Sequence, residues 1–225
     1  MGYVVFPSIF GEGVRAFFTG REPGIEVASL TGGRPLYMPR QKHTGRVVVL
    51  GPRTGIETAD SVITALKGTF IGVQVADCVP MLLHDPARGA IAAVHAGWRG
   101  TAQGILKRTV RAMAEEFGTR PADLLLAVGP AIRGGCYEVG PEVLEAVAAA
   151  TGEGQFHTHL EGRLCLDLPA ANRLQALSEG LREENVWVSE ECTSCLPDRF
   201  HSYRHGQSGG RRSPVGRQGG FIAMT

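Results

Sequence analysis

The sequence contains no long hydrophobic run and no excess of charge of either sign. Its 225 residues include 23 Lys and Arg against 22 Asp and Glu, which leaves a formal net charge of +1. This balance does not favour a protein that binds polyanions, and 43% of apolar residues is too high for a disordered chain. No segment approaches the roughly 18 consecutive apolar residues of a membrane helix. These absences leave a globular protein without a membrane partner.

The N-terminal residues also lack the basic segment and apolar core of a signal peptide, so we expect a cytoplasmic protein. Lysine is scarce as well: Lys42, Lys67 and Lys107 are the only ones, and the other basic residues are arginines. We attribute this bias to genome composition, since arginine content alone does not indicate phosphate binding. No repeat or long linker divides the chain. We therefore expect one domain, residues 1–225.

A disulfide framework is not expected. The chain has five cysteines, an odd number at irregular spacing, without a secretion signal. They are Cys78, Cys136, Cys165, Cys192 and Cys195. Reduced cysteines of this kind serve as apolar filler, metal ligands or nucleophiles. The composition alone does not choose among these roles.

Short runs of apolar and β-branched residues bounded by Gly, Pro and Asp predict most of the strands. The expected strands are 3–6, 14–18, 46–50, 60–63, 70–75, 79–84, 90–95, 123–128 and 186–189, with 79–84 and 90–95 forming a hairpin. The expected helices are 100–117, 141–150 and 169–180. The glycine-rich segment 206–220 is expected to be a loop. Helices and strands do not alternate strictly, which favours an α+β fold over a doubly wound one.

Three segments combine a histidine or a cysteine with a turn at the end of an expected strand. They are Gln41-Lys42-His43-Thr44-Gly45, Ala76-Asp77-Cys78-Val79-Pro80 and Val94-His95-Ala96-Gly97-Trp98-Arg99-Gly100. Each has a structural explanation on its own: a histidine bonded to the backbone, a buried thiol beside a turn, and a tight strand–helix joint. Together they place ligands or nucleophiles at strand ends, where rigid scaffolds commonly carry chemistry.

These residue types suit more than one kind of site. Two imidazoles and a thiolate are a common ligand set for Zn²⁺, with a fourth position left for water. Copper accepts the same ligands. A cysteine and a histidine can also act as nucleophile and base without a metal. The residues alone leave these three possibilities open.

The same segments resemble a known family. The shared motifs are Ala-Asp-Cys at 76–78, His-Ala-Gly-Trp-Arg-Gly at 95–100, Cys-Tyr-Glu-Val at 136–139 and Phe-x-Ser-Tyr-Arg at 200–204. They are similar to those of the purine nucleoside phosphorylase YfiH/LACC1 family, also described as the multicopper polyphenol oxidoreductase (laccase-domain) or peptidoglycan editing factor family. The first two motifs at this separation are highly specific. The sequence departs from the family at Lys42, at His201 and in an extended segment 206–214.

The resemblance implies a CNF1/YfiH-like α+β fold, a single compact domain with layered mixed β-sheets flanked by helices. It also implies a zinc site formed by His43, Cys78 and His95, with copper as the alternative metal. Family members are implied to cleave purine nucleosides with phosphate and to deaminate adenosine. We therefore expect a zinc-dependent enzyme that binds a purine nucleoside and phosphate, as a monomer or small homo-oligomer.

Two further residues are expected to take part in catalysis. Arg99 lies next to the His95 motif at the expected start of a helix, where it is suited to bind an anion. Asp77 is either a proton carrier or, as we prefer, a residue that orients one of the histidines.

Two other enzyme functions remain as alternatives. One is a copper-dependent polyphenol oxidase, although a multicopper enzyme needs more histidines than the seven present here. The other is a cysteine-type hydrolase that acts on a peptidoglycan precursor through Cys78.

A second cysteine motif, Cys192-x-x-Cys195, is expected to be structural. With His201 and His205 it has the residue order of a zinc finger, but only five residues separate Cys195 from His201, where about twelve are needed. A thioredoxin-like redox pair would need a strand before the motif and a helix after it, and neither is evident.

A nucleic-acid-binding module is the alternative from a different class. The tail carries Arg204, Arg211, Arg212 and Arg217, but single-strand binding also needs aromatic residues interleaved with the basic ones. Only Tyr203 and Phe221 lie nearby, so we expect no nucleic-acid partner.

Overall fold

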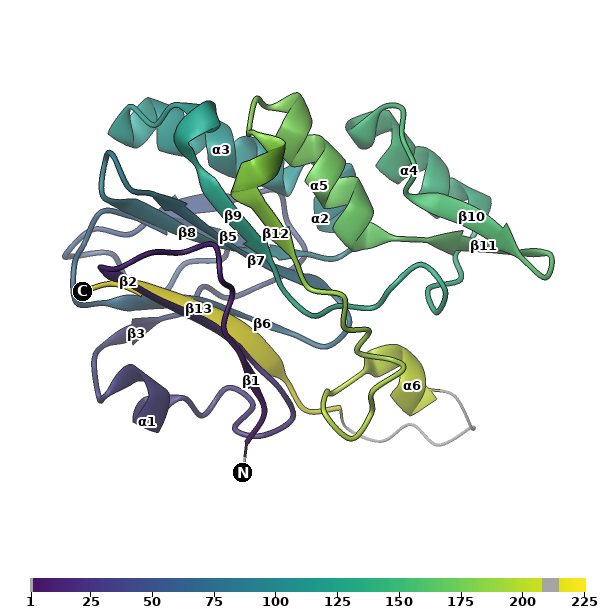
Figure 1. The fold of residues 1–225 in the computed structure, drawn as a ribbon, viewed down its shortest axis with the longest axis horizontal. Coiled ribbons are helices and arrows are strands. Elements are labelled where there is room, and N and C mark those ends of the chain that lie inside the picture. The colour runs from purple at the N-terminus through teal and green to yellow at the C-terminus, as the bar shows by residue number, and fades with distance from the viewer. Residues whose placement is uncertain (1, 208–214) are drawn as a thin grey trace.

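Two β-sheets stacked face to face form the centre of the molecule, and helices cover the outer side of one of them (Figure 1). The computed structural model describes residues 2–207 and 215–225. The first sheet has the strand order β1-β2-β13-β6-β3, and the second has the order β12-β9-β7-β8-β5-β4. Strands and helices are mixed rather than alternating, which confirms the α+β fold.

The elements have the following bounds. The five-stranded sheet contains β1 (Val4–Val5), β2 (Val14–Thr19), β3 (Leu36–Tyr37), β6 (Phe70–Val75) and β13 (Gln218–Met224). The six-stranded sheet contains β4 (Val47–Val49), β5 (Ser61–Thr64), β7 (Val79–Asp85), β8 (Ala90–Ala96), β9 (Leu125–Val128) and β12 (Val186–Val188). A separate hairpin joins β10 (His157–Leu160) to β11 (Arg163–Leu166). The helices are α1 (Ala28–Thr31), α2 (Trp98–Ala102), α3 (Ile105–Phe117), α4 (Pro141–Thr151), α5 (Leu168–Ser178) and α6 (Tyr203–Gln207), with short 3₁₀ turns at Pro121–Asp123 and Glu183–Asn185.

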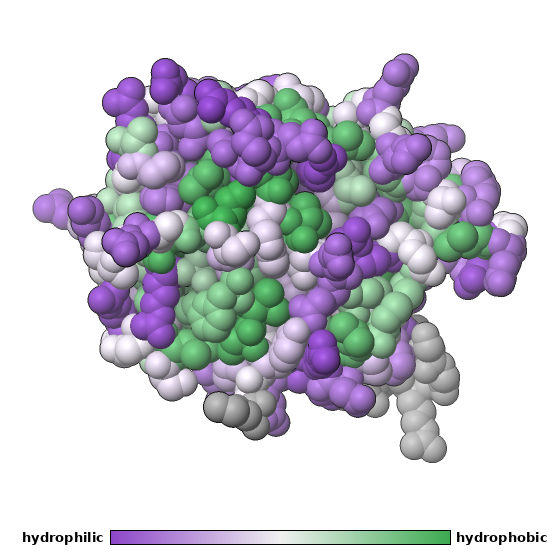
Figure 2. Space-filling model, viewed as in Figure 1, coloured by the Kyte–Doolittle hydropathy of each residue, from purple (hydrophilic) through white to green (hydrophobic). Residues whose placement is uncertain are grey.

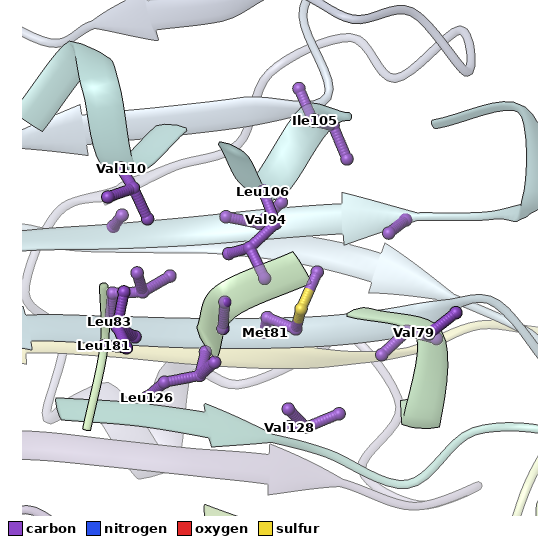
Figure 3. Close-up of a cluster of buried hydrophobic side chains, with 14 of the residues drawn as sticks. Val79, Met81, Leu83, Val94, Ile105, Leu106, Val110, Leu126, Val128 and Leu181 are labelled. Carbon is purple, nitrogen blue, oxygen red and sulfur yellow. The ribbon is translucent and has the colours of Figure 1, made fainter. Parts of the chain in front are cut away.

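The six-stranded sheet is buried on both faces because its strands alternate between two cores. Met81 and Leu83 of β7 belong to the cluster under the helices, whereas Leu82 faces the other sheet. Figure 3 shows Leu106 and Val110 of α3 above the strands that carry these residues. Since both faces are covered, β7 and β8 form a rigid base for residues at their ends.

Helix α3 shows how the sequence divides between core and solvent. Its buried positions recur at helical spacing and are apolar except for Thr109, while Arg108, Arg111 and Glu115 are exposed on the opposite face. Hydrophilic residues accordingly dominate the upper edge of the molecule above α3 (Figure 2). Within residues 2–207 and 215–225, no helix has the length and hydrophobicity needed to span a bilayer.

The structure corrects two of the expected elements. The helix expected over 100–117 is two helices, because Gly104 has φ +65° and separates α2 from α3. The segment expected to be a loop as far as Phe221 becomes strand at Gln218, while its part at 208–214 lies outside the described residues. The hairpin of β7 and β8 is confirmed, with Pro80 opposite His95.

Candidate active site

The hairpin register brings two of the expected site residues to one edge of the six-stranded sheet. His95 is the sixth residue of β8, and Cys78 directly precedes β7. Because Val79 pairs with Ala96 in the antiparallel ladder, Cys78 lies beside the end of β8. The positions of both residues therefore follow from the strand pairing.

The third residue, His43, lies in the loop before β4, and Asp60 fixes this loop to the sheet. The Asp60 carboxylate accepts hydrogen bonds from the backbone N–H groups of Lys42 (3.3 Å), His43 (3.0 Å) and Thr44 (2.5 Å). His43 has φ +56°, a left-handed conformation that is unfavourable for a residue with a side chain. The bonds to Asp60 offset this strain and hold the His43 ring over the strand ends.

Asp60 also orients His95. Its Oδ1 lies 2.7 Å from His95 Nδ1, and its backbone carbonyl accepts a 2.8 Å bond from the His95 N–H. Both side chains are buried. With Nδ1 bonded to a carboxylate, the other ring nitrogen of His95 remains available to the site. One buried aspartate thus positions both histidines.

The three side chains converge. His43 Nε2 lies 3.9 Å from Cys78 Sγ, and the rings of His43 and His95 have centroids 4.9 Å apart at 77°. One ligand atom from each residue lies within 4.8 Å of the others. Gly97 makes room for this arrangement, since a Cβ there would be 2.9 Å from Cys78 Sγ and 3.1 Å from His43 Cδ2.

The electrostatics of the site favour a positive charge between Cys78 and Asp60. Burial opposes ionisation of Cys78, but the neighbouring His95 and His43 lower the pKa of the thiol to about 6. Burial likewise lowers the pKa of His95, but the Cys78 thiolate and the Asp60 carboxylate outweigh it and raise the pKa to about 9. Despite its burial, hydrogen bonds from His95 and Thr44 hold the pKa of Asp60 well below its usual value.

Asp77 does not orient a histidine, which corrects the role we preferred for it. Its carboxylate accepts hydrogen bonds from Thr193 Oγ1 (2.6 Å), Ser202 Oγ (3.0 Å) and the Arg204 backbone N–H (2.6 Å). Asp77 has φ +81°, and these bonds hold it in that conformation.

Asp60 is the residue that sequence reasoning missed. Its only signal is a charged residue directly before an apolar strand, because its partners lie 16 to 35 residues away.

A cavity of about 530 Å³ opens above the three side chains. The residues that line it include three arginines, Arg99, Arg204 and Arg217, together with Trp98 and Tyr137. Arg99 lies in the first turn of α2 as expected, with its Cζ 4.3 Å from the centroid of the Trp98 ring. Arginines can bind an anion, and aromatic side chains can stack on a planar ring. The cavity therefore suits a ligand that combines an anionic group with a planar ring.

Comparison with known proteins identifies the family of the chain. The family model described as multi-copper polyphenol oxidoreductase laccase matches residues 23–225. The chain belongs to this family. This membership confirms the resemblance that the sequence motifs indicated.

Relatives with different names are similar to the chain. A purine nucleoside phosphorylase of Deinococcus radiodurans is 42% identical over 174 residues, which cover 76% of this chain and 66% of the relative. Adenosine deaminase RL5, from an unknown prokaryotic organism, is 37% identical over 182 residues, covering 75% of this chain and 69% of the relative. The chain thus spans about two thirds of the length of these relatives. The crystal structure of YlmD from Geobacillus stearothermophilus has a TM-score of 0.85 at 26% identity, covering 96% of this chain and 93% of that one.

The donor set in this laccase-family chain fits a single metal ion. Two imidazoles and a thiolate are typical of zinc sites with an open position. The Asp60–His95 pair also has the carboxylate–histidine arrangement that supports metal-bound histidines.

The second cysteine motif has a partner that the sequence did not indicate. Cys192 and Cys195 lie together, and the third donor of the group they form is Cys136 rather than His201 or His205. Of the arginines in the nucleic-acid alternative, Arg211 and Arg212 lie outside the described residues, while Arg204 and Arg217 line the cavity.

Proposed function

We propose that the protein is a cytoplasmic, zinc-dependent purine nucleoside phosphorylase that also deaminates adenosine. The observation that carries this proposal is the convergence of His43, Cys78 and His95 below a cavity with arginine and aromatic walls. The names of the relatives support the substrate class, since one is a purine nucleoside phosphorylase and another an adenosine deaminase.

His43, Cys78 and His95 would hold the metal through the imidazole nitrogens and the thiolate. When bound, zinc supplies Lewis acidity and an acidified water molecule near neutral pH. Asp60 keeps Nδ1 of His95 engaged, so that Nε2 is presented to the site. The low pKa of Cys78 keeps the thiol ionised at neutral pH, which is the form that binds a metal.

Phosphorolysis requires phosphate close to C1′ of the ribose and a proton donor for the departing base. Arg99 would bind the phosphate, with Arg204 and Arg217 on the same cavity wall. Burial and the negative charge of Cys78 raise the pKa of Tyr137 to about 12, so its phenol keeps its proton and can donate a hydrogen bond to the base. Asp77 would act as a positioning residue, because it holds the Arg204 backbone at the cavity.

A copper-dependent polyphenol oxidase is the second candidate, and the family description supports it. Copper accepts histidine and cysteine ligands, so the same three residues would bind it. Metal analysis of protein produced without added copper separates the two candidates. We expect about one zinc per His43–Cys78–His95 site, whereas stoichiometric copper would favour the oxidase.

The decisive experiment is to incubate the purified protein with adenosine, with and without phosphate. We expect inosine in both reactions, and a free purine base with ribose 1-phosphate only when phosphate is present. Cys78→Ser should abolish both activities, while Cys165→Ala, which removes a buried thiol outside the cavity lining, should keep them. Absence of every one of these products would contradict the proposal and leave the peptidoglycan hydrolase to be tested.

A further inference from the structure

A group of three cysteines lies apart from the candidate active site. The sulfur atoms of Cys136, Cys192 and Cys195 are within 4.8 Å of one another, and those of Cys136 and Cys195 are 3.1 Å apart. Cys192 is buried, Cys136 is half-buried and Cys195 is exposed. The cluster is therefore reachable from solvent on one side and enclosed on the other.

The backbone holds the two loops of this cluster in place independently of the sulfur atoms. Cys192 forms a β-bridge with Ala131, and the Thr193 N–H donates to the Ala131 carbonyl at 3.1 Å. The turn after Arg133 closes through a 2.9 Å bond from the Cys136 N–H to the Arg133 carbonyl. Because the backbone is fixed, the three thiols approach one another without a chain rearrangement, as a ligand site requires.

Backbone N–H groups also face the sulfur of Cys192: those of Arg133, Ser194 and Cys195 donate hydrogen bonds to it. Hydrogen bonds from N–H groups to a cysteine sulfur are the outer support commonly found around metal-bound thiolates.

We propose that Cys136, Cys192 and Cys195 bind a thiophilic divalent cation of the zinc type, forming a second metal centre distinct from the candidate active site. Zinc–sulfur bonds are about 2.3 Å long, which puts sulfur atoms of a tetrahedral site about 3.8 Å apart. The sulfur atoms of Cys136 and Cys195 are 3.1 Å apart, somewhat closer than this value, and all three sulfur atoms lie within 4.8 Å of one another. The ion replaces the thiol protons, which leave to solvent. Three protein donors leave the fourth position to water on the exposed side of Cys195.

The bound ion would tie two loops that form part of the active-site wall. Thr193, next to Cys192, bonds to the Asp77 carboxylate, and the Ile132 N–H donates to the Asp77 carbonyl at 3.0 Å. Tyr137, next to Cys136, lines the cavity. The centre is therefore structural: it stabilises the cavity wall and does not contact the substrate.

Cobalt titration of metal-free, reduced protein tests this inference. Co²⁺ is the probe because thiolate ligands give it a charge-transfer absorption that reports the number of sulfur donors. We expect about two equivalents to bind per chain, and about one in the double variant Cys136→Ser/Cys195→Ser. Cys78→Ser should remove the other equivalent, and Cys165→Ala should keep both. The absorption lost in the double variant should exceed that lost in Cys78→Ser, since three thiolates are involved rather than one.

The single variant Cys195→Ser, at an exposed position, serves if the double variant fails to fold. The inference is overturned if this variant binds as much Co²⁺ as the wild type with an unchanged spectrum. A disulfide at the cluster would also overturn it. Freshly purified protein would then hold no metal at the cluster, and a thiol assay would find two free thiols fewer than after treatment with a reductant. Loss of binding in Cys195→Ser with normal wild-type binding supports it. If the wild type binds only one equivalent of Co²⁺ and Cys78→Ser still binds it, the result would support this centre and contradict the proposed metal site at His43, Cys78 and His95.

Discussion

The two cysteine-containing clusters show how differently one fold can use the same side chain. Cys78 directly precedes a strand buried on both faces, and its neighbours are two imidazoles positioned by a buried carboxylate. Cys136 lies in a surface loop, and its neighbours are other thiols. The pKa of Cys78 is consequently lowered to about 6, whereas burial and the neighbouring thiols raise the pKa of Cys136 to about 12. A site for chemistry and a site for structural support differ in the charges around the sulfur.

Replacing Asp60 should produce the largest difference in metal affinity between the His43–Cys78–His95 cluster and the Cys136–Cys192–Cys195 cluster. In Asp60→Ala both histidines lose their common support, so we expect metal affinity and turnover at the active site to fall on the order of 100-fold. Metal content at each cluster and the rate of adenosine conversion are the measurements.

Asp85→Ala is the matched control for Asp60→Ala. Asp85 is equally buried but lies at the far end of β7, where it accepts hydrogen bonds from the N–H groups of Ala87 and Arg88. This variant should lose stability but keep the active-site metal. Equal losses of metal in both variants would mean that Asp60 acts only through folding.

The thiols should differ in reactivity once the metal is removed. In chelated protein at pH 7 we expect iodoacetamide to modify Cys78 roughly a hundredfold faster than Cys136, because Cys78 is already a thiolate. The Cys78 rate should be flat above its pKa of about 6 and fall as the pH drops below it, since protonation removes the nucleophile.

Mass spectrometry of the modified peptides measures both alkylation rates. Metal-loaded protein should react slowly at Cys78, because the ion occupies the thiolate. A Cys78 rate that is fast from the start and indifferent to chelator would instead identify a metal-free nucleophile.

Gly97 tests how tightly the active-site cluster is packed. A Cβ at this position meets both Cys78 and His43, so we expect Gly97→Ala to lower turnover roughly tenfold by displacing the ligands. Gly135→Ala is the control, since a Cβ there meets nothing within 4 Å and the residue adjoins the other cluster. Steady-state kinetics should show a lower kcat for Gly97→Ala than for Gly135→Ala. If the two variants are equally active, catalysis tolerates displacement of the ligands.

The smallest effect on catalysis is expected at the thiol cluster, which consists of Cys136, Cys192 and Cys195. Cys195→Ser should change kcat/KM for the nucleoside by no more than about threefold, because its loop supports the cavity without contacting the substrate. The change should be seen in KM and in the thermal midpoint rather than in kcat. A loss comparable to that of Asp60→Ala would make the thiol cluster part of the reaction.

The sequence predicted the parts of the fold whose pattern is local. Runs such as 70–75 and 79–84 are apolar and β-branched, and they form β6 and β7 with nearly the expected bounds. The break at Gly104 was missed because the residues on either side have helical spacing. Strand β13 was missed because Gly219 and Gly220 look like loop residues. The structure needs glycine there, since a Cβ on Gly219 would lie 2.6 Å from the Val73 carbonyl oxygen.

The candidate site could be predicted only where short motifs mark its residues. His43, Cys78 and His95 stand in such motifs, and the structure brings them together. Asp60 and Cys136 stand in no pattern that points to their partners, because the contacts that define them are long-range. Asp60 meets His95 across 35 residues and Cys136 meets Cys195 across 59. Such pairings depend on strand order, which local patterns do not contain.

The central place of β13 has a consequence for how the chain folds as it is synthesised. This strand pairs with both β2 and β6, and it reaches β2 across 200 residues, as in the bond from the Gly219 N–H to Thr19 Oγ1. Until the ribosome has translated β13, the inner edges of β2 and β6 have no partner in this sheet. Contacts so distant along the chain slow folding, and open strand edges invite pairing with other nascent chains. The five-stranded sheet is therefore the last layer to close, and its assembly should benefit most from chaperones that shield emerging polypeptides.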